Sequence, residues 1–169
     1  MKRHSILALV LAGLFTSAMS LGISASADAS DIHNIGNSKC LQPINGSMEL
    51  GAAIVQKSCD ASAAQDWTLI SLGGTRYRFK SRLSGLCLDA RGGATNGTPV
   101  VQWICNGISN EIWDTRFSPF PLPAVVTITS RVSGTTSHCL DVPGNQDLDG
   151  LAMQLWRCND TRAQLWGLR

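Results

Sequence analysis

The sequence predicts an all-β domain built from three similar units. Two observations support this fold class: one spacing of cysteine, glycine and tryptophan recurs three times, and no long stretch has the period of an amphipathic helix. A fixed internal period indicates a repeat architecture. Three units without distinct end units favour a closed three-fold arrangement over an open solenoid.

The recurring spacing is carried by six cysteines, which form successive pairs 19, 18 and 19 residues apart. Each second cysteine has a glycine eight residues before it and a tryptophan eight residues after it. The units therefore span about residues 32–70, 75–117 and 124–169. The repeated residues are Cys40, Cys59, Cys87, Cys105, Cys139 and Cys158, with Gly51, Gly97 and Gly150, and Trp67, Trp113 and Trp166.

Short alternating segments within the units indicate strands. Arg76–Lys80 alternates polar and apolar residues, as a half-buried strand does, and Val125–Thr129 occupies the same place in the third unit. Frequent turn-forming residues between such segments are typical of all-β barrels and propellers. Six cysteines allow fifteen pairings. One disulfide inside each unit is the simplest arrangement for three equivalent units.

The third unit carries C-L-D, then a glycine, then Q-L-W-R-C-N and a second Q-L-W. This combination resembles the ricin B-type lectin β-trefoil, which also occurs as carbohydrate-binding modules attached to secreted glycosidases. The resemblance covers roughly residues 32–169 and implies a six-stranded barrel with a hairpin cap and pseudo-three-fold symmetry. It predicts a ricin B-type lectin domain over residues 28–169.

The N-terminus is expected to be an export signal. Lys2 and Arg3 precede a short apolar run, and small residues end at Ala27, so residues 1–27 have the pattern of a secretory signal peptide cut after Ala27. The run is short and interrupted for a membrane anchor. Six cysteines in the exported part suit an oxidising extracellular or periplasmic location.

Charge and cysteine spacing exclude several classes of partner. The chain has 14 Lys and Arg against 12 Asp and Glu; removing Lys2 and Arg3 leaves 12 against 12. A neutral mature chain without a basic run argues against nucleic acid and against insertion into or binding to an anionic membrane. No C-x-x-C pair suggests a zinc site, and no motif suggests another metal or a cofactor.

Two tryptophans of the third unit are predicted to have different roles. Trp166 has a tryptophan partner in every unit, which indicates the core, whereas Trp156 corresponds to Trp103 and Lys57, and a position that accepts lysine is exposed. An exposed tryptophan suits the C–H face of a sugar ring, although a tryptophan that only packs at the rim is the alternative.

Polar residues around Trp156 complete the predicted sugar site. The resemblance places pocket residues at Asp141, Gln154, Trp156 and Gln164, with Ala163 where the family has asparagine. An ionised carboxylate can accept hydrogen bonds from adjacent hydroxyls. The alternative for Asp141 is a turn-capping role beside Pro143.

The other two units depart from this pattern. In the second unit Asp89, Trp103 and Asn110 match, but Val101 and Glu111 replace the two glutamines, which predicts a weaker site or one with a changed preference. The first unit is predicted to be scaffold, because four of its pocket positions differ, at Gln42, Val55, Lys57 and Ala64. A proline-rich stretch, 118–123, is expected to be a turn or a contact surface.

We therefore expect a secreted, non-catalytic carbohydrate-binding lectin that binds a galactose-type or related glycan mainly in the third repeat. A small glycosidase needs a carboxylate pair, and the only glutamates after Ala27, Glu49 and Glu111, are both expected at the surface. A second alternative is a cell-binding toxin subunit, similar to the flanking subunits of cytolethal distending toxin. Expected partners are glycans or glycoconjugates, with a toxin or enzyme chain under that alternative.

Overall fold

The computed structural model describes residues 29–117, 125–134 and 136–169. The predicted signal peptide and the proline-rich stretch lie outside these residues. None of the helices in the described part of the chain is long and apolar enough to cross a bilayer.

The described chain consists of short strands and single 3₁₀ turns, without an α-helix. The strands are β1 (Ala29–Ser30), β2 (Ile32–Asn34), β3 (Lys39–Pro43), β4 (Ile54–Ser58), β5 (Trp67–Ser71), β6 (Arg76–Ser81), β7 (Cys87–Ala90), β8 (Thr98–Trp103), β9 (Trp113–Phe117), β10 (Val125–Ser130), β11 (His138–Asp141), β12 (Gln154–Arg157) and β13 (Trp166–Leu168). The turns are η1 (Ile44–Gly46), η2 (Ser109–Glu111), η3 (Val132–Gly134), η4 (Pro143–Asn145) and η5 (Arg162–Gln164).

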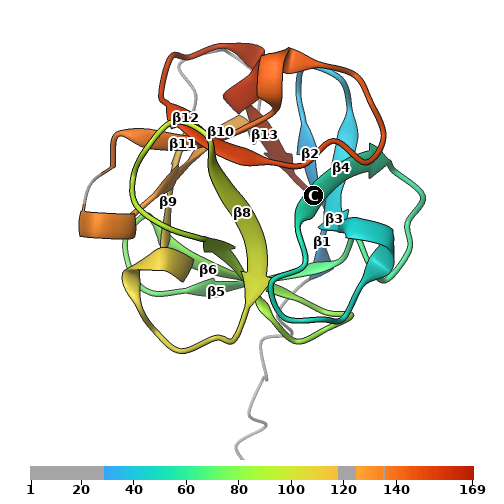
Figure 1. Ribbon diagram of the computed structural model, residues 1–169, viewed down its shortest axis with the longest axis horizontal. Coiled ribbons are helices and arrows are strands. Elements are labelled where there is room, and N and C mark those ends of the chain that lie inside the picture. Colours follow the sequence, from blue (N-terminus) through green and yellow to red (C-terminus); the bar gives the residue numbers. More distant parts are fainter. Residues whose placement is uncertain (1–28, 118–124, 135) are drawn as a thin grey trace, which may run out of the picture.

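The predicted β-trefoil is confirmed. Strands β2, β13, β10, β9, β6 and β5 pair antiparallel in that order, and β1, directly before β2, pairs with β5 and closes the ring. Each repeat adds a hairpin, β3–β4, β7–β8 or β11–β12. Figure 1 shows the three repeats, blue-green, green-yellow and orange-red, around a common centre.

The three tryptophans predicted for the core lie in it. Trp67, Trp113 and Trp166 are fully buried. Each indole Nε1 donates a hydrogen bond to the carbonyl of the leucine that follows the first cysteine of its repeat, at 3.0–3.1 Å, and these leucines are Leu41, Leu88 and Leu140. The bond satisfies the polar atom of a large side chain that otherwise contributes only apolar surface. The repeated tryptophan and leucine therefore form one packing unit, built three times.

The three repeated glycines join the repeats to one another. The N–H of Gly51 donates to Gln102, that of Gly97 donates to Leu155, and that of Gly150 donates to Gln56, at 2.8–2.9 Å. All three glycines have φ between 76° and 85°, a backbone conformation that favours glycine. The recurring glycine therefore forms a turn that bonds to the next repeat.

One disulfide closes each repeat, as predicted. The bonds are Cys40–Cys59, Cys87–Cys105 and Cys139–Cys158. The two ends of the domain are also joined, because the N–H of Asp31 donates to the carbonyl of Arg169 at 2.7 Å and the Arg169 Nε donates to the Asp31 carboxylate at 3.0 Å. Strands β13 and β2 are held side by side by these contacts.

Candidate functional site

The third repeat has an open cavity of about 620 Å³ beside the hairpin β11–β12. It lies between this hairpin and the turns η4 and η5, which approach one another in the fold. Its lining consists of Asp141, Val142, Gly144, Asn145, Gln154, Trp156, Asn159, Thr161 and Ala163. Three of the residues predicted for this site, Asp141, Gln154 and Trp156, are thus brought together at one surface.

Asp141 is the charged group of the cavity and is held by two amides. Its Oδ1 accepts a hydrogen bond from Gln154 Nε2 at 2.8 Å, and its Oδ2 accepts one from Gln164 Nε2 at 3.0 Å. The residue is only 4% exposed. Burial raises the pKa of Asp141, and the two amide donors work against that rise because they stabilise the ionised form. A fixed carboxylate with free lone pairs can accept hydrogen bonds from ligand hydroxyls.

Gln164 supports this carboxylate from behind. It is fully buried and does not line the cavity. Its Oε1 accepts the N–H of Asn159, and its Nε2 also donates to the carbonyl of Arg157. Its amide is therefore oriented from both ends. The structure places Gln164 as a residue that positions Asp141, whereas Gln154 reaches the cavity itself.

Trp156 and Trp166 differ as the sequence predicted: Trp156 is 38% exposed and Trp166 is fully buried. Trp156 lies opposite Cys139 in the hairpin register, so the disulfide and the strand pairing fix its backbone. Its ring forms an apolar wall of the cavity. An apolar wall facing a buried acceptor is the arrangement expected for a ligand with both C–H and O–H groups.

Three polar lining residues were missed by the sequence reasoning. Asn145 ends the turn η4, and Asn159 and Thr161 follow the disulfide, where Asn159 Oδ1 accepts hydrogen bonds from both the N–H and the hydroxyl of Thr161. The Pro-Gly-Asn turn beside Asp141 was a usable signal, because such a turn brings its last residue back toward the strand. Ala163, where an asparagine was expected, is 5% exposed.

The second repeat keeps the carboxylate but not its donors. Asp89 is 4% exposed and faces Val101 in the register, and within the described residues no side chain donates to its carboxyl. The pKa of Asp89 is raised to about 6, mainly by burial and then by the Glu111 charge, while Arg91 opposes the rise. Trp103 is half-buried, and Asn110 Nδ2 donates to the carbonyl of Ala90 at 3.0 Å.

The expected surface position of Glu111 is wrong. Its side chain is fully buried, at the place of Gln164 in the third repeat. It accepts hydrogen bonds from the N–H groups of Asn106 and Gly107 and forms an ion pair with Arg78 of β6, Nε to Oε1, at 2.9 Å. A buried carboxylate is tolerated here because donors and a cation surround it. Glu49 is exposed, as expected.

The first repeat, predicted to be scaffold, retains a cavity of about 610 Å³ with a different lining. Gln42 stands where Asp141 stands in the third repeat, and its Oε1 accepts a hydrogen bond from Gln65. Lys57 stands where Trp156 stands and pairs with Asp60 at 3.3 Å. This cavity therefore has neither the carboxylate nor the aromatic wall of the third.

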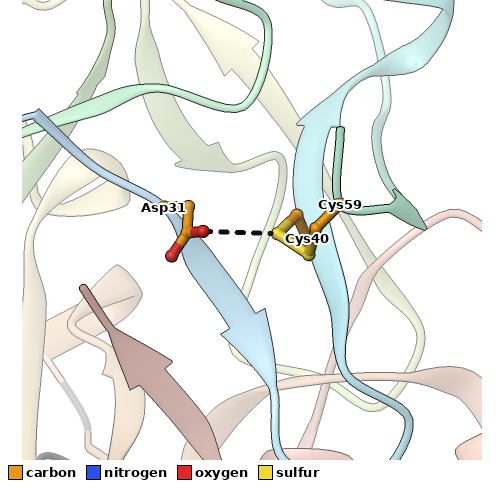
Figure 2. Close-up of side chains that lie close together, drawn as sticks. All are labelled: Asp31, Cys40 and Cys59. Atoms are coloured by element: carbon orange, nitrogen blue, oxygen red, sulfur yellow. Dashed lines mark hydrogen bonds between the residues drawn. A yellow bond between two sulfur atoms is a disulfide. The ribbon is translucent and has the colours of Figure 1, made fainter. Parts of the chain in front are cut away.

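Within residues 29–117, 125–134 and 136–169, two groups of sulfur and carboxylate atoms have the spacing of metal ligands, but neither fits a metal. One is Asp31 with Cys40 and Cys59, drawn in Figure 2, and the other is Cys87 and Cys105 with Glu111. In both groups the two sulfurs are joined in a disulfide, and a metal requires thiolates. The 3.7 Å contact between Asp31 Oδ2 and Cys40 Sγ is a packing contact, because a disulfide sulfur has no proton to donate.

Comparison with known proteins gives one family and a consistent group of structures. Residues 20–103 match the model of the ricin-type β-trefoil lectin domain-like family. Serine protease 1 of Rarobacter faecitabidus is 32% identical over 79 residues, which are 45% of this chain and 15% of that protein. The similarity thus spans only a small part of the protease.

Among solved structures, the designed three-fold symmetric protein ThreeFoil has a TM-score of 0.76 and 26% identity, covering 83% of this chain and 96% of that one. An exo-β-1,3-galactanase from Clostridium thermocellum has a TM-score of 0.75 and 26% identity, covering 83% of this chain and 29% of that one. The ricin B-like lectin of Macrolepiota procera, solved with lactose, shares the fold at 19% identity, with a TM-score of 0.68 over 85% of this chain and 96% of that one.

Proposed function

This chain belongs to the ricin-type β-trefoil lectin-like family, and we propose that it binds glycans, without catalysis, mainly through the cavity of its third repeat. The observation that carries the proposal is the geometry of Asp141, a buried carboxylate that two amides orient beside the exposed ring of Trp156. The same cavity is open to solvent and has room for a sugar residue.

The chemistry of the cavity suits a sugar that presents two adjacent hydroxyls on one edge and C–H groups on one face. The Asp141 oxygens accept the hydroxyl protons in charge-assisted hydrogen bonds. The Trp156 ring covers the C–H face and loses little entropy on binding, since only two side-chain torsions are fixed. Asn145 and Thr161 supply further polar contacts at the rim.

We further propose a galactose-type ligand. The Macrolepiota lectin was solved with lactose and an earthworm R-type lectin with GalNAc, and both ligands contain a ring of galactose configuration. Ala163 supplies no side-chain hydrogen bond, so Asp141 and Gln154 are left to read the hydroxyl pattern. Specificity then depends mainly on these two side chains, which bond to each other, with Asn145 and Thr161 at the rim.

The absence of catalysis is proposed from the same lining. Glycoside hydrolysis uses two carboxyl groups on either side of the bond, one of them protonated. Asp141 is the only carboxylate among the residues that line the cavity. Glu111 lies buried in another repeat and is already bonded to two backbone N–H groups and to Arg78.

We also propose that residues 1–27 direct export and that cleavage follows Ala27, leaving residues 28–169 as the working domain. Three disulfides within 120 residues, from Cys40 to Cys158, suit an oxidising compartment. Mass spectrometry of the protein secreted by its source cells tests the cleavage, since a mature N-terminus other than Asp28 contradicts it.

A second candidate is a targeting module or subunit within a larger assembly. Its support is the share of the relatives that the similarity covers, 15% of the serine protease and 29% of the galactanase. A toxin subunit is a further form of this candidate. Purification from the source cells distinguishes it, because a stable complex with an enzyme or toxin chain supports it and an isolated chain that binds glycans favours an independent lectin.

A glycan array on residues 28–169 tests the main proposal. We expect hits among galactose-terminated glycans, and Trp156→Ala should weaken them. Lys57→Ala, at the matching exposed hairpin position of the first repeat, should leave the hits unchanged, since that cavity has Gln42 in place of Asp141 and no aromatic wall. The proposal is contradicted if the folded protein binds no glycan, or if Trp156→Ala binds as well as the unchanged chain.

A further inference from the structure

Arg91 covers the tryptophan of the second repeat. Its Cζ lies 5.2 Å from the centroid of the Trp103 ring, within the range of a cation–π interaction. A Cβ on Gly51 would stand 2.9 Å from Arg91 Nη1 and 3.3 Å from Trp103 Cζ3, so both side chains pack closely against Gly51 of the first repeat. The guanidinium is therefore held in place, although Arg91 is exposed.

This arrangement changes what the second repeat can bind. The guanidinium covers one face of the Trp103 ring, so that face is not free to stack on a neutral sugar. A guanidinium stacked on a ring keeps its N–H groups in its own plane, where they match a carboxylate in bidentate fashion. Among the described residues Arg91 forms no ion pair. Its N–H groups are available to a ligand.

The carboxyl group of Asp89, in the same repeat, also lies in surroundings that differ from those of its counterpart Asp141. Asp141 is kept as an acceptor by two amide donors, whereas Asp89 faces Val101 and the carboxylate of Glu111 in their place. Neither replacement can donate a hydrogen bond to it. A buried carboxyl without donors is more stable in its neutral form, which offers an O–H group. Below about pH 6 both Arg91 and Asp89 are thus hydrogen-bond donors, whereas Asp141 of the third repeat is an acceptor.

We propose that the second repeat is a separate binding site for a sugar residue that carries a carboxylate, such as a hexuronate. The Arg91 guanidinium binds the carboxylate of the sugar, and the protonated Asp89 donates a hydrogen bond to it. The Trp103 ring packs against the guanidinium and holds it in place. This site does not depend on the third repeat. A negative result for the acidic sugar therefore leaves the proposed glycan site of the third repeat untouched, and the reverse also holds.

The site has a defined pH window. The charged groups around Asp89 are Glu111 on η2, Arg78 on β6, which is paired with Glu111, and Arg91 after β7, while the facing residue of β8 is the neutral Val101. The pKa of Asp89 is raised to about 6. Sugar carboxyls ionise at roughly pH 3–4, as other α-substituted carboxyls do. Binding is therefore strongest between about pH 4 and 6 and weakens above 6, where the ionised Asp89 repels the ligand.

Nuclear magnetic resonance of the full mature domain tests this inference. The probes are D-galacturonate and D-galactose, which differ only in oxidation at C6, and the readouts are the indole N–H signals of Trp103 and Trp156. At pH 5 galacturonate should shift the Trp103 signal in a saturable way, and galactose should not. Equal shifts of the Trp103 signal by both sugars, or no shift by galacturonate, would overturn the inference.

Two variants sharpen the test. Arg91→Gln keeps a long polar side chain without the charge. Because Arg91 is exposed, we expect the variant to fold like the unchanged chain, and a thermal melt checks this. We expect galacturonate affinity to fall at least tenfold. Asp89→Asn is neutral at every pH, so its affinity should be equal at pH 5 and pH 7.5, whereas the unchanged chain should bind several-fold more weakly at pH 7.5. Unchanged affinity in Arg91→Gln, or pH dependence that persists in Asp89→Asn, contradicts the proposal.

Discussion

The hairpins of the third and second repeats have the same pairing register and different side-chain chemistry. Both have a hairpin closed by a disulfide, a buried aspartate two residues after the first cysteine and a tryptophan opposite that cysteine. They differ at the two positions that support the aspartate, Gln154 and Gln164 in one and Val101 and Glu111 in the other.

The difference shows that buried neighbours decide what a pocket carboxyl does. Asp141 is held as an acceptor by amides, and Asp89 is left as a carboxyl that protonates near pH 6. Gln164 and Glu111 are both fully buried, so neither reaches a ligand. We therefore expect that a repeat can change its ligand preference while its buried aspartate and its partly exposed tryptophan stay the same.

The largest expected effect separates the core from the pocket. Trp166→Ala removes a fully buried ring and its hydrogen bond to Leu140, and should destabilise the domain by about 3–5 kcal/mol. Trp156→Ala, in the same repeat, should shift the melting temperature little because that ring is 38% exposed. Denaturant unfolding of both variants measures the contrast, and an early melt of Trp156→Ala would show that this ring is structural.

The core half of this contrast could be predicted from the sequence, because each repeat needs the same leucine, glycine and tryptophan. Three aligned copies identified the core tryptophans, the disulfides and the exposed position of Trp156. The sequence did not locate Glu111, because a charged residue is usually assigned to the surface. Its burial depends on N–H groups of its own loop and on Arg78, 33 residues earlier, and only the folded chain brings these together.

The same limit applies to the rim of each pocket. Arg91 on Trp103, and Asn145 beside Asp141, are contacts between a loop and a hairpin whose relative position no spacing rule gives. Sequence comparison among repeats identifies what is kept in all three. For that reason, the comparison says least about the contacts of residues that differ from one repeat to the next.

Gln164→Glu is expected to convert part of the third pocket into the second. The glutamate can still accept the N–H of Asn159, but it withdraws a donor from Asp141 and places a second negative charge beside it. Hydrogen bonds to charged groups contribute about 1.5–3 kcal/mol, so affinity for a neutral glycan should fall by roughly tenfold or more. Calorimetry with the best array ligand measures this change.

The matched control for that variant is Gln65→Glu in the first repeat, where the supported residue is the neutral Gln42. It should leave glycan affinity unchanged. If Gln164→Glu binds like the unchanged chain, then the amide of Gln164 is not needed to hold Asp141 as an acceptor, and the two pockets differ for another reason.

Trp156→Ala should weaken neutral glycan binding by about 1–3 kcal/mol, as expected on losing a central aromatic contact. Asp141→Ala should weaken it comparably, since it removes the charged acceptor. Trp103→Ala should have a smaller effect on the same ligand, because Arg91 already covers that ring. Calorimetric titrations of the three variants rank them, and a larger loss in Trp103→Ala would assign the neutral site to the second repeat instead.

The smallest expected effect is a pH dependence of stability that belongs to the second repeat alone. The pKa of Asp89 is about 6 in the folded chain, above its ordinary value of 3.8. A raised folded pKa means that protonation favours the folded state, so this contribution is fully present below pH 3.8 and is lost as pH rises through 6. The free energy of unfolding of Asp89→Asn, relative to that of the unchanged chain, should therefore rise between pH 4.5 and 7 by on the order of 1 kcal/mol. One pKa unit corresponds to about 1.4 kcal/mol, and partial solvation reduces the effect. His33 and His138, whose pKa values are lowered by burial, change stability in the opposite direction over this range, but they are common to both proteins and cancel in the difference.

Asp141→Asn serves as the comparison: the two amide donors counteract the effect of burial on Asp141, so its difference curve should be flatter. Urea unfolding at pH 4.5, 5.5 and 7 measures both curves, and equal slopes for the two variants would mean that the loss of amide donors does not distinguish the two carboxyls.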